Sequence, residues 1–206
     1  MKSLCVFFGK DKISSDTGAR IRFWVHKQQA KEVFRNHKIL LSDQFKEVDW
    51  KMVYSALHEL PQMFQIWAYK QVMGVAGTNL YQYKYRPNHD PKCTSCTRCV
   101  ESCAHVLECQ EEVRVETLLG TIDFLDIWMK KIGTDEVLRN CLVRYAKGRG
   151  TITIKDIVGD RTHRLYPLAQ SQDRIGWRRF MEGMISKEIT GIQKSYLSFS
   201  SYHLII

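Results

Sequence analysis

The sequence predicts a mainly α-helical protein with a small central hairpin held together by cysteine and histidine side chains. Three observations lead to this fold class. Apolar residues recur at helical spacing through much of the chain. Only four of the 206 residues are proline and twelve are glycine, too few for a disordered or fibrous chain. Five of the seven cysteines fall within the 18 residues from Lys92 to Cys109.

The first part of the chain contains three expected helices. Residues 21–41 predict a helix with apolar side chains on one face and lysine or arginine over much of the rest. Asp49 is placed to cap the next helix. Pro61 suits the first turn of a third helix, which Gly74 would end. The expected apolar stripe of that third helix consists of Phe64, Trp67, Ala68 and Val72.

The segment before the cysteines resembles a linker with three alternating tyrosines. Tyr81, Tyr83 and Tyr85 at this spacing favour one short strand resting on the core. Because Lys84 and Arg86 stand between and beside them, the same tyrosines could instead stack on unpaired nucleotides.

The second half of the chain is again predicted to be helical. Apolar residues at 3-4 spacing indicate a long amphipathic helix over 112–132. Thr134 is the expected cap of the following helix, which carries Cys141 as a core thiol and ends near Gly148. Residues 150–170 are expected to be irregular, with no more than one short strand. Ser171 would open the last helix.

These elements divide the chain into three regions. Residues 1–80 form a helical, basic N-terminal segment, residues 81–110 a Cys/His module, and residues 111–206 a helical C-terminal region. The three regions can also form one continuous domain, since 206 residues suit one large domain or two small ones.

The chain is basic, with a net charge of +9 and an isoelectric point of about 9.2. Residues 1–92 hold 15 basic and 8 acidic side chains, whereas residues 93–147 hold 7 and 9. This balance favours a polyanionic partner, RNA or DNA, although a surface enriched in lysine without such a partner would give the same charge.

No secretory signal is evident, and no stretch approaches the roughly 20 apolar residues that a membrane-spanning helix requires. We therefore expect an intracellular protein of the nucleus or cytoplasm, with no membrane partner. Clustered cysteines in a reducing compartment are more often metal ligands than disulfides. The oligomeric state is left undecided by the sequence.

The cysteine cluster offers one strong set of metal ligands. Cys93 and Cys96 form a C-x2-C pair, and after eight intervening residues His105 and Cys109 form an H-x3-C pair. Zinc is bound tetrahedrally by four ligands and accepts both thiolate sulfur and imidazole nitrogen. A histidine and a cysteine four residues apart lie on one face of a helical turn. The spacing predicts a structural zinc site in this segment.

Two other ligand sets are contained in the same residues. Cys93, Cys96, Cys99 and Cys103 have the spacing of a bacterial ferredoxin run, although Ala104 stands where that run has proline. Cys96, Cys99, His105 and Cys109 come close to the spacing of a zinc knuckle. Reduced cysteines that hold no metal are the remaining alternative.

The stretches "LPQMFQIWAYKQVMG" and "TNLYQYKYRPNHDPKCTSCTRCVESCAHVLEC" resemble the zinc-binding region downstream of the reverse transcriptase in non-LTR retrotransposon proteins. That family has a helical segment, a C-x2-C pair, an acidic residue and an H-x3–5-C pair. The matching positions, within residues 48–109, are Leu60–Gly74, Cys93 and Cys96, Glu101, and His105 and Cys109. The resemblance implies a part in nucleic-acid binding.

The chain departs from an enzyme of this family. We find no polymerase signature with paired aspartates that could hold two magnesium ions, and no phosphate-binding loop. We expect no catalytic residues and interpret the chain as a C-terminal fragment of a transposable-element protein.

The cations that flank the cluster and would contact phosphates are Lys84, Arg86, Lys92 and Arg98. The alternatives are an iron–sulfur electron-transfer protein, or a structural interaction domain or inactive relic.

Overall fold

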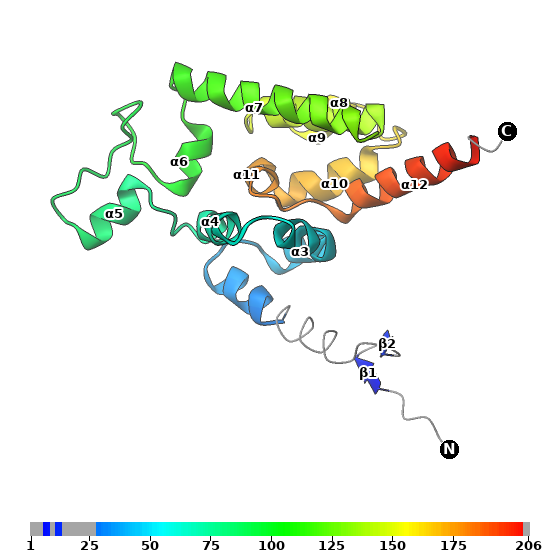
Figure 1. The fold of residues 1–206 in the computed structure, drawn as a ribbon, viewed down its shortest axis with the longest axis horizontal. Helices are drawn as coiled ribbons and strands as arrows, with labels where there is room; N and C mark the ends of the chain where they lie inside the picture. Colours follow the sequence, from blue (N-terminus) through cyan, green and yellow to red (C-terminus); the bar gives the residue numbers. More distant parts are fainter. Residues whose placement is uncertain (1–5, 9–10, 14–27, 204–206) are drawn as a thin grey trace. The chain divides into compact units, whose positions relative to one another are not determined.

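The computed structural model describes residues 6–8, 11–13 and 28–203 (Figure 1). The chain divides into two compact units, Met1–Phe45 and Lys46–Ile206. The region boundaries expected after residues 80 and 110 both fall inside the second unit, which contains the whole cysteine cluster.

In the first unit, strand β1 (Val6–Phe8) pairs antiparallel with β2 (Asp11–Ile13), a short pair of which the sequence pattern gives no sign. Residues 28–36 are helical, as predicted within 21–41, and the part of that prediction before residue 28 lies outside the described residues. The rings of Phe34 and Phe45 meet edge to face, with their centroids 6.0 Å apart. Helix α2 (Ser42–Glu47) begins in this unit.

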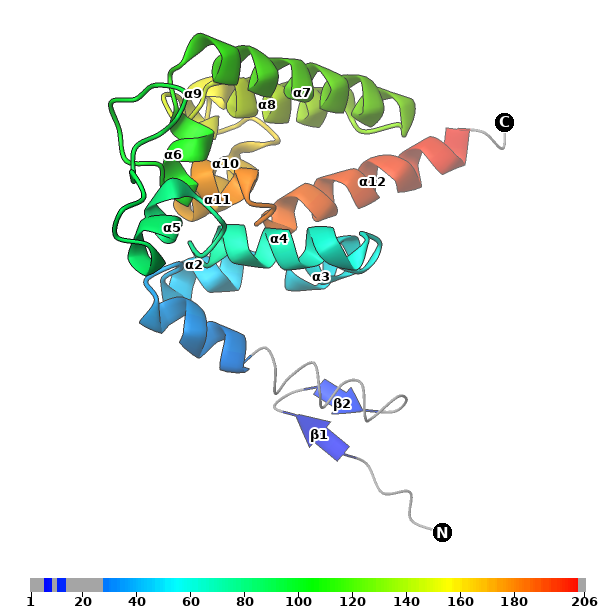
Figure 2. The same ribbon diagram turned by 60° about the vertical axis from the view of Figure 1, so that its left-hand side comes forward.

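The second unit is built almost entirely of helices, which confirms the predicted fold class. Figures 1 and 2 show α7, α8 and α9 on one side, α10, α11 and α12 in the middle, and α3 and α4 on the opposite side. The helices are α3 (Trp50–His58), α4 (Gln62–Val72), α5 (Asn79–Tyr85), α6 (Cys103–Glu108), α7 (Glu112–Lys131), α8 (Glu136–Lys147), α9 (Ile154–Val158), α10 (Tyr166–Ile175), α11 (Trp177–Met181) and α12 (Lys187–His203).

The hydrophobic core of this unit lies around α8 and α10. Its buried members are Leu138, Cys141, Leu142, Tyr145, Ile154, Leu165, Leu168, Ala169 and Trp177. The indole nitrogen of Trp177 donates a hydrogen bond to the carbonyl of Ala146 at 3.2 Å, so its polar atom is satisfied. Burial raises the pKa of Cys141 to about 11, which keeps the thiol neutral and confirms its prediction as a core residue.

The capping residues predicted from the sequence are confirmed for α3 and differ by one position for α8. Asp49 caps α3 by accepting from the Met52 backbone N–H at 3.2 Å, as predicted. The long helix expected over 112–132 is α7. The cap of α8 is Asp135 rather than Thr134, because the buried Asp135 carboxylate accepts from the Leu138 N–H at 2.8 Å and also pairs with Arg164.

Two predictions of strand or irregular structure are wrong. The three tyrosines lie on helix α5, since Thr78 caps it and the rings of Tyr81 and Tyr85 meet one turn apart, with centroids separated by 5.1 Å. The stretch 150–170 contains α9, which starts with a capping box between Thr153 and Asp156.

The prediction that Ser171 opens a helix is wrong: Ser171 lies inside α10, and the stretch expected to be one helix contains parts of three. Helix α10 already begins at Tyr166, and Gly176, with φ of 93°, separates it from α11. Helix α12 then starts at Lys187.

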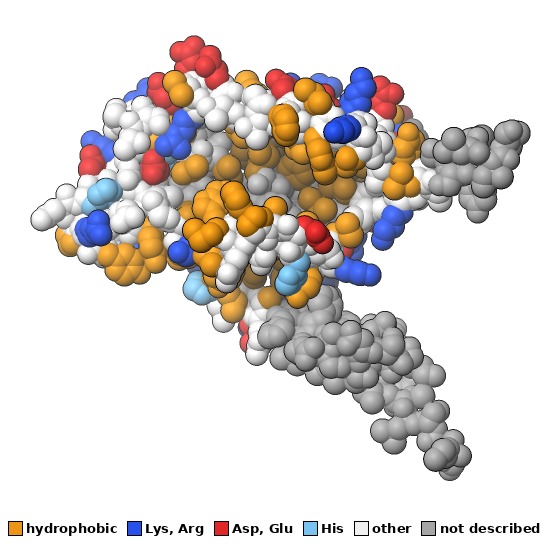
Figure 3. Space-filling model, in the orientation of Figure 1, with side chains coloured by type: hydrophobic (Ala, Val, Ile, Leu, Met, Phe, Trp, Pro, Cys, Tyr) orange, Lys and Arg blue, Asp and Glu red, His pale blue; other side chains and the backbone are white. Residues whose placement is uncertain are grey.

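Phe64 and Trp67, the two large residues of the apolar stripe expected on α4, face water, whereas Ala68 and Val72 are half-buried. The exposed fraction is 60% for Phe64 and 59% for Trp67, and it reaches 78% for the neighbouring Met63. Figure 3 shows apolar side chains gathered over α3 and α4. We call this surface, formed by Met63, Phe64, Ile66, Trp67 and Tyr69, the α4 apolar face.

Replacing Leu168 by alanine is expected to lower the free energy of unfolding by about 2–5 kcal/mol, because the side chain is fully buried and its loss leaves a cavity. Chemical denaturation monitored by circular dichroism measures the change. Ile127→Ala, at a position that is 66% exposed, is the control and should change stability by less than about 0.5 kcal/mol. Equal effects of the two changes would contradict the location of the core.

Candidate metal centre

Four side chains of the second unit converge on one point. The ligand atoms of Cys93, Cys96, His105 and Cys109 all lie within 4.8 Å of one another. The sulfurs of Cys93 and Cys109 are 4.0 Å apart, and the sulfur of Cys96 lies 3.4 Å from His105 Nε2. Two sulfurs bound to one zinc ion at about 2.3 Å in tetrahedral geometry are separated by roughly 3.8 Å. The group therefore has the spacing of four ligands around a single metal ion.

The first pair of cysteines lies in a tight loop closed by backbone hydrogen bonds. Lys92 and Val100 form an isolated antiparallel bridge, so the central segment does contain a short hairpin. Within it, the Cys93 N–H donates to the Cys99 carbonyl and the Thr97 N–H donates to the Cys93 carbonyl, each at 2.8 Å. We call residues 92–100 the cysteine loop.

The cysteine loop directs backbone N–H groups at the two sulfurs. The N–H groups of Cys99 and Arg98 lower the pKa of Cys96 to about 7. Burial disfavours the thiolate of Cys93, but the N–H groups of Cys96 and Ser95 outweigh it, so that the pKa of Cys93 is also lowered. Since the thiolate is the form that binds metal, the loop favours the ligand state of both side chains.

The pKa of Cys109 is shifted in the opposite direction from the pKa values of Cys93 and Cys96. Burial raises the pKa of the Cys109 thiol, and the nearby sulfurs of Cys93 and Cys96 raise it further. Three thiolates in contact repel one another unless a cation neutralises them. A divalent ion within the group would remove this repulsion and hold all three sulfurs deprotonated.

The second pair of ligands is positioned by helix α6. Ser102 caps this helix by accepting from the His105 N–H at 3.1 Å. The Cys109 N–H donates to the His105 carbonyl at 2.7 Å, so the two residues lie one helical turn apart and face the same way. The local sequence therefore places both side chains opposite the cysteine loop.

Helices outside the segment hold the group in place. Arg149, just after α8, donates to the carbonyl of Cys109 at 2.6 Å. Arg114 on α7 donates to Ser95 Oγ at 2.8 Å and pairs with Glu101 at 3.2 Å. The Gln71 amide on α4 donates to the carbonyl of Cys103 at 2.8 Å. These supports leave no signal in the sequence, because the partners are separated by 13 to 40 residues with no recognisable spacing.

Glu101, the acidic residue in the motif that resembles the retrotransposon family, is held by hydrogen bonds on both of its carboxylate oxygens. One carboxylate oxygen of Glu101 accepts from Arg114, and the other accepts from the Asn79 N–H at 3.3 Å. Glu101 thereby connects the start of α5 to α7 directly beside the cysteine loop.

The other two ligand sets considered from the sequence both require Cys99. Its side chain is exposed and lies outside the group of four. Cys103 is buried at the first turn of α6 and is also outside the group. The arrangement therefore matches the set of Cys93, Cys96, His105 and Cys109.

The four cations expected to meet phosphates surround the same segment. Lys84 lies on α5, Arg86 follows its last turn, and Lys92 and Arg98 belong to the cysteine loop. All four are exposed, and none forms an ion pair with any residue in the described part of the chain.

Cys96→Ser is expected to remove stoichiometric metal from the purified protein, because three remaining ligands cannot close a tetrahedral structural site. Cys99→Ser is the matched control and should retain the metal, since its sulfur lies outside the group. Elemental analysis of both variants beside the wild type measures the difference. Metal loss in the control, or retention in Cys96→Ser, would contradict this ligand set.

No helix within residues 28–203 is long and apolar enough to cross a membrane.

Comparisons of the chain with protein families, with curated proteins and with solved structures found no match.

Proposed function

We propose that this chain is a zinc-binding module of retroelement origin that binds nucleic acid and has no catalytic machinery of its own. The observation that carries the proposal is the convergence of three sulfurs and one imidazole from a segment of 17 residues, Cys93 to Cys109. This donor set and this geometry are those of structural zinc sites.

Zinc suits the group better than an iron–sulfur cluster does. Zinc is bound by mixed sulfur and nitrogen ligands, whereas ferredoxin-type clusters are held by four thiolates. A cluster on the C-x2-C-x2-C-x3-C run would need Cys99, whose thiol is turned to solvent. Four protein ligands also leave no open position for a reactive water, so the metal has a structural role.

Hydrogen bonds from neighbouring helices reach this segment, but it has almost no apolar core of its own. The buried cluster at its centre consists of Cys93, Cys96 and Cys109 alone. Because no aliphatic or aromatic side chain fills this centre, metal binding supplies the free energy that folds the cysteine loop.

The charge of the chain and the surface of the segment support a nucleic-acid partner, RNA or DNA. The chain carries a net charge of +9. Lys84, Arg86, Lys92 and Arg98 offer exposed, unpaired cations around the metal group, among the described residues. Contacts from such side chains to phosphates depend on salt and carry no sequence information.

The retroelement origin rests on the sequence motif. Helix α4 (Gln62–Val72) lies where the family resemblance places a helical segment, and it is followed by the two ligand pairs in the expected order. This agreement supports the proposal. We also propose an intracellular compartment, because cysteines stay reduced there and remain available as metal ligands.

The purified protein is expected to be colourless and to contain about one zinc and no iron per chain. Chelation should speed amide hydrogen exchange across residues 92–109 and leave α8 and α10 protected, because those helices have their own core. Mass-spectrometric hydrogen exchange with and without chelator measures this. A brown protein, or unchanged protection of the cysteine loop, would overturn the structural zinc site.

Binding to a single-stranded RNA should weaken with rising salt, with a slope of log K against log[salt] of about −0.7 per phosphate contact. Replacing Lys84, Arg86, Lys92 and Arg98 together by alanine should reduce that slope by about 3. Fluorescence anisotropy at several salt concentrations measures it.

The matched control removes four exposed cations from other surfaces, Lys130, Lys131, Lys155 and Arg161, and so lowers the net charge equally. This variant should keep the wild-type slope. Equal losses in the two variants would show that binding follows net charge alone, and a wild type that binds no RNA or DNA at low salt would refute the proposed function.

A further inference from the structure

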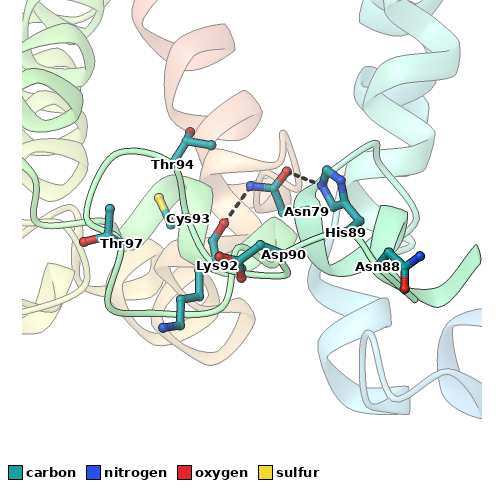
Figure 4. A pocket seen from close by; sticks show the side chains of 8 residues that line it. All are labelled: Asn79, Asn88, His89, Asp90, Lys92, Cys93, Thr94 and Thr97. Atoms are coloured by element: carbon teal, nitrogen blue, oxygen red, sulfur yellow. Dashed lines mark hydrogen bonds between the residues drawn. The ribbon is translucent and has the colours of Figure 1, made fainter. Parts of the chain in front are cut away.

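An open cavity of about 350 Å³ lies between the start of α5 and the cysteine loop. Figure 4 shows Asn79, Asn88 and His89 on one side of it and Cys93, Thr94 and Thr97 on the other. Its volume falls at the lower end of the range of small-molecule sites in proteins, roughly 300–1,000 Å³.

The back of this cavity is fixed by a chain of hydrogen bonds. Asn79 Nδ2 donates to the Lys92 carbonyl at 2.6 Å, and Asn79 Oδ1 lies 3.0 Å from His89 Nε2 (Figure 4). Asp90 accepts from the Lys92 N–H at 3.0 Å. These bonds tie the two walls together, so the cavity depends on the same loop that carries the first two metal ligands.

Several polar groups in the cavity remain available to a ligand. Among the described residues, the side chains of Asn88 and Thr94 have no hydrogen-bond partner, and the Lys92 ammonium has no ion pair. One oxygen of Asp90 accepts from the backbone, and the other can accept from a ligand.

The lining selects the chemistry of the ligand. The Asp90 carboxylate would repel a bare anion. The Lys92 ammonium would repel a divalent cation, and the lining offers such a cation only one carboxylate as a ligand. A neutral, flat molecule with both donors and acceptors on its edge satisfies the lining, and the edges of nucleobases have this pattern.

We propose that this cavity takes one unstacked nucleobase of a single-stranded nucleic acid while Lys92 and Arg98 contact the flanking phosphates. The inference rests on the proposed function and specifies its ligand. A base inside a duplex cannot enter such a cavity, whereas unpaired bases can be splayed out and bonded along their edges.

The test compares two probes that carry the same charge. One is a mixed-sequence single-stranded RNA of eight nucleotides, and the other is the corresponding abasic ribose-phosphate chain. The wild-type holoprotein should bind the RNA about tenfold more tightly than the abasic chain at one salt concentration, because only the RNA supplies edge contacts. Fluorescence anisotropy gives both dissociation constants.

The double variant Asn88→Ala/Thr94→Ala should bind both probes alike, with the wild-type affinity for the abasic chain and the wild-type metal content. Neither change alters the net charge or removes a hydrogen bond of the scaffold. The matched control, Ser55→Ala/Gln170→Ala, removes a hydroxyl and an amide from exposed positions outside the cavity and should keep the tenfold preference.

The outcomes separate the two proposals. A wild type that binds both probes equally, or a cavity variant that keeps the preference, would overturn the base site and leave nucleic-acid binding in place. A wild type that binds neither probe would overturn the proposed function and the base site together.

Discussion

The convergence of Cys93, Cys96, His105 and Cys109 is the constraint on which the central segment depends. Their ligand atoms lie within 4.8 Å of one another, and the buried cluster at that centre, within the described part of the chain, consists of the three cysteines. Elsewhere in the second unit, helices pack through aliphatic and aromatic side chains around Leu138 and Leu168. The unit thus combines two kinds of core, one formed by apolar burial and one formed by four side chains with the spacing of metal ligands.

Arginine side chains join these two cores. Arg149 donates to the carbonyl of Cys109, and Arg114 donates to Ser95 and pairs with Glu101, so α7 and the turn after α8 each contact residues 93–109 through a guanidinium group. A guanidinium group presents several donors in a fixed plane, and it can hold a loop in one orientation. Because Asn79 adds a further tie to Lys92, the cavity wall, the cysteine loop and α5 form one connected structure.

The sequence predicted the features that depend on local spacing. The C-x2-C and H-x3-C pairs identified the four side chains that the fold brings together, because each pair is set by one turn of backbone. Helix α7 and the Asp49 cap were likewise visible as a periodic pattern and a single capping residue. The tyrosines of α5 were misread as a strand because alternation over five residues also fits a short helix once Thr78 caps it. The contacts of Arg114, Arg149 and Gln71 were beyond sequence reasoning, since they depend on how distant helices pack.

The α4 apolar face, with Met63, Phe64 and Trp67 open to water, has a consequence for how the molecule behaves in solution. Copies of a chain with a charge of +9 repel one another, and that repulsion keeps their apolar faces apart in dilute buffer. Dissolved ions shorten the range of the repulsion to about 8 Å at physiological ionic strength, while the attraction between apolar surfaces persists. Raising the ionic strength would thus weaken the proposed contacts to polyanions and at the same time favour self-association through the α4 apolar face.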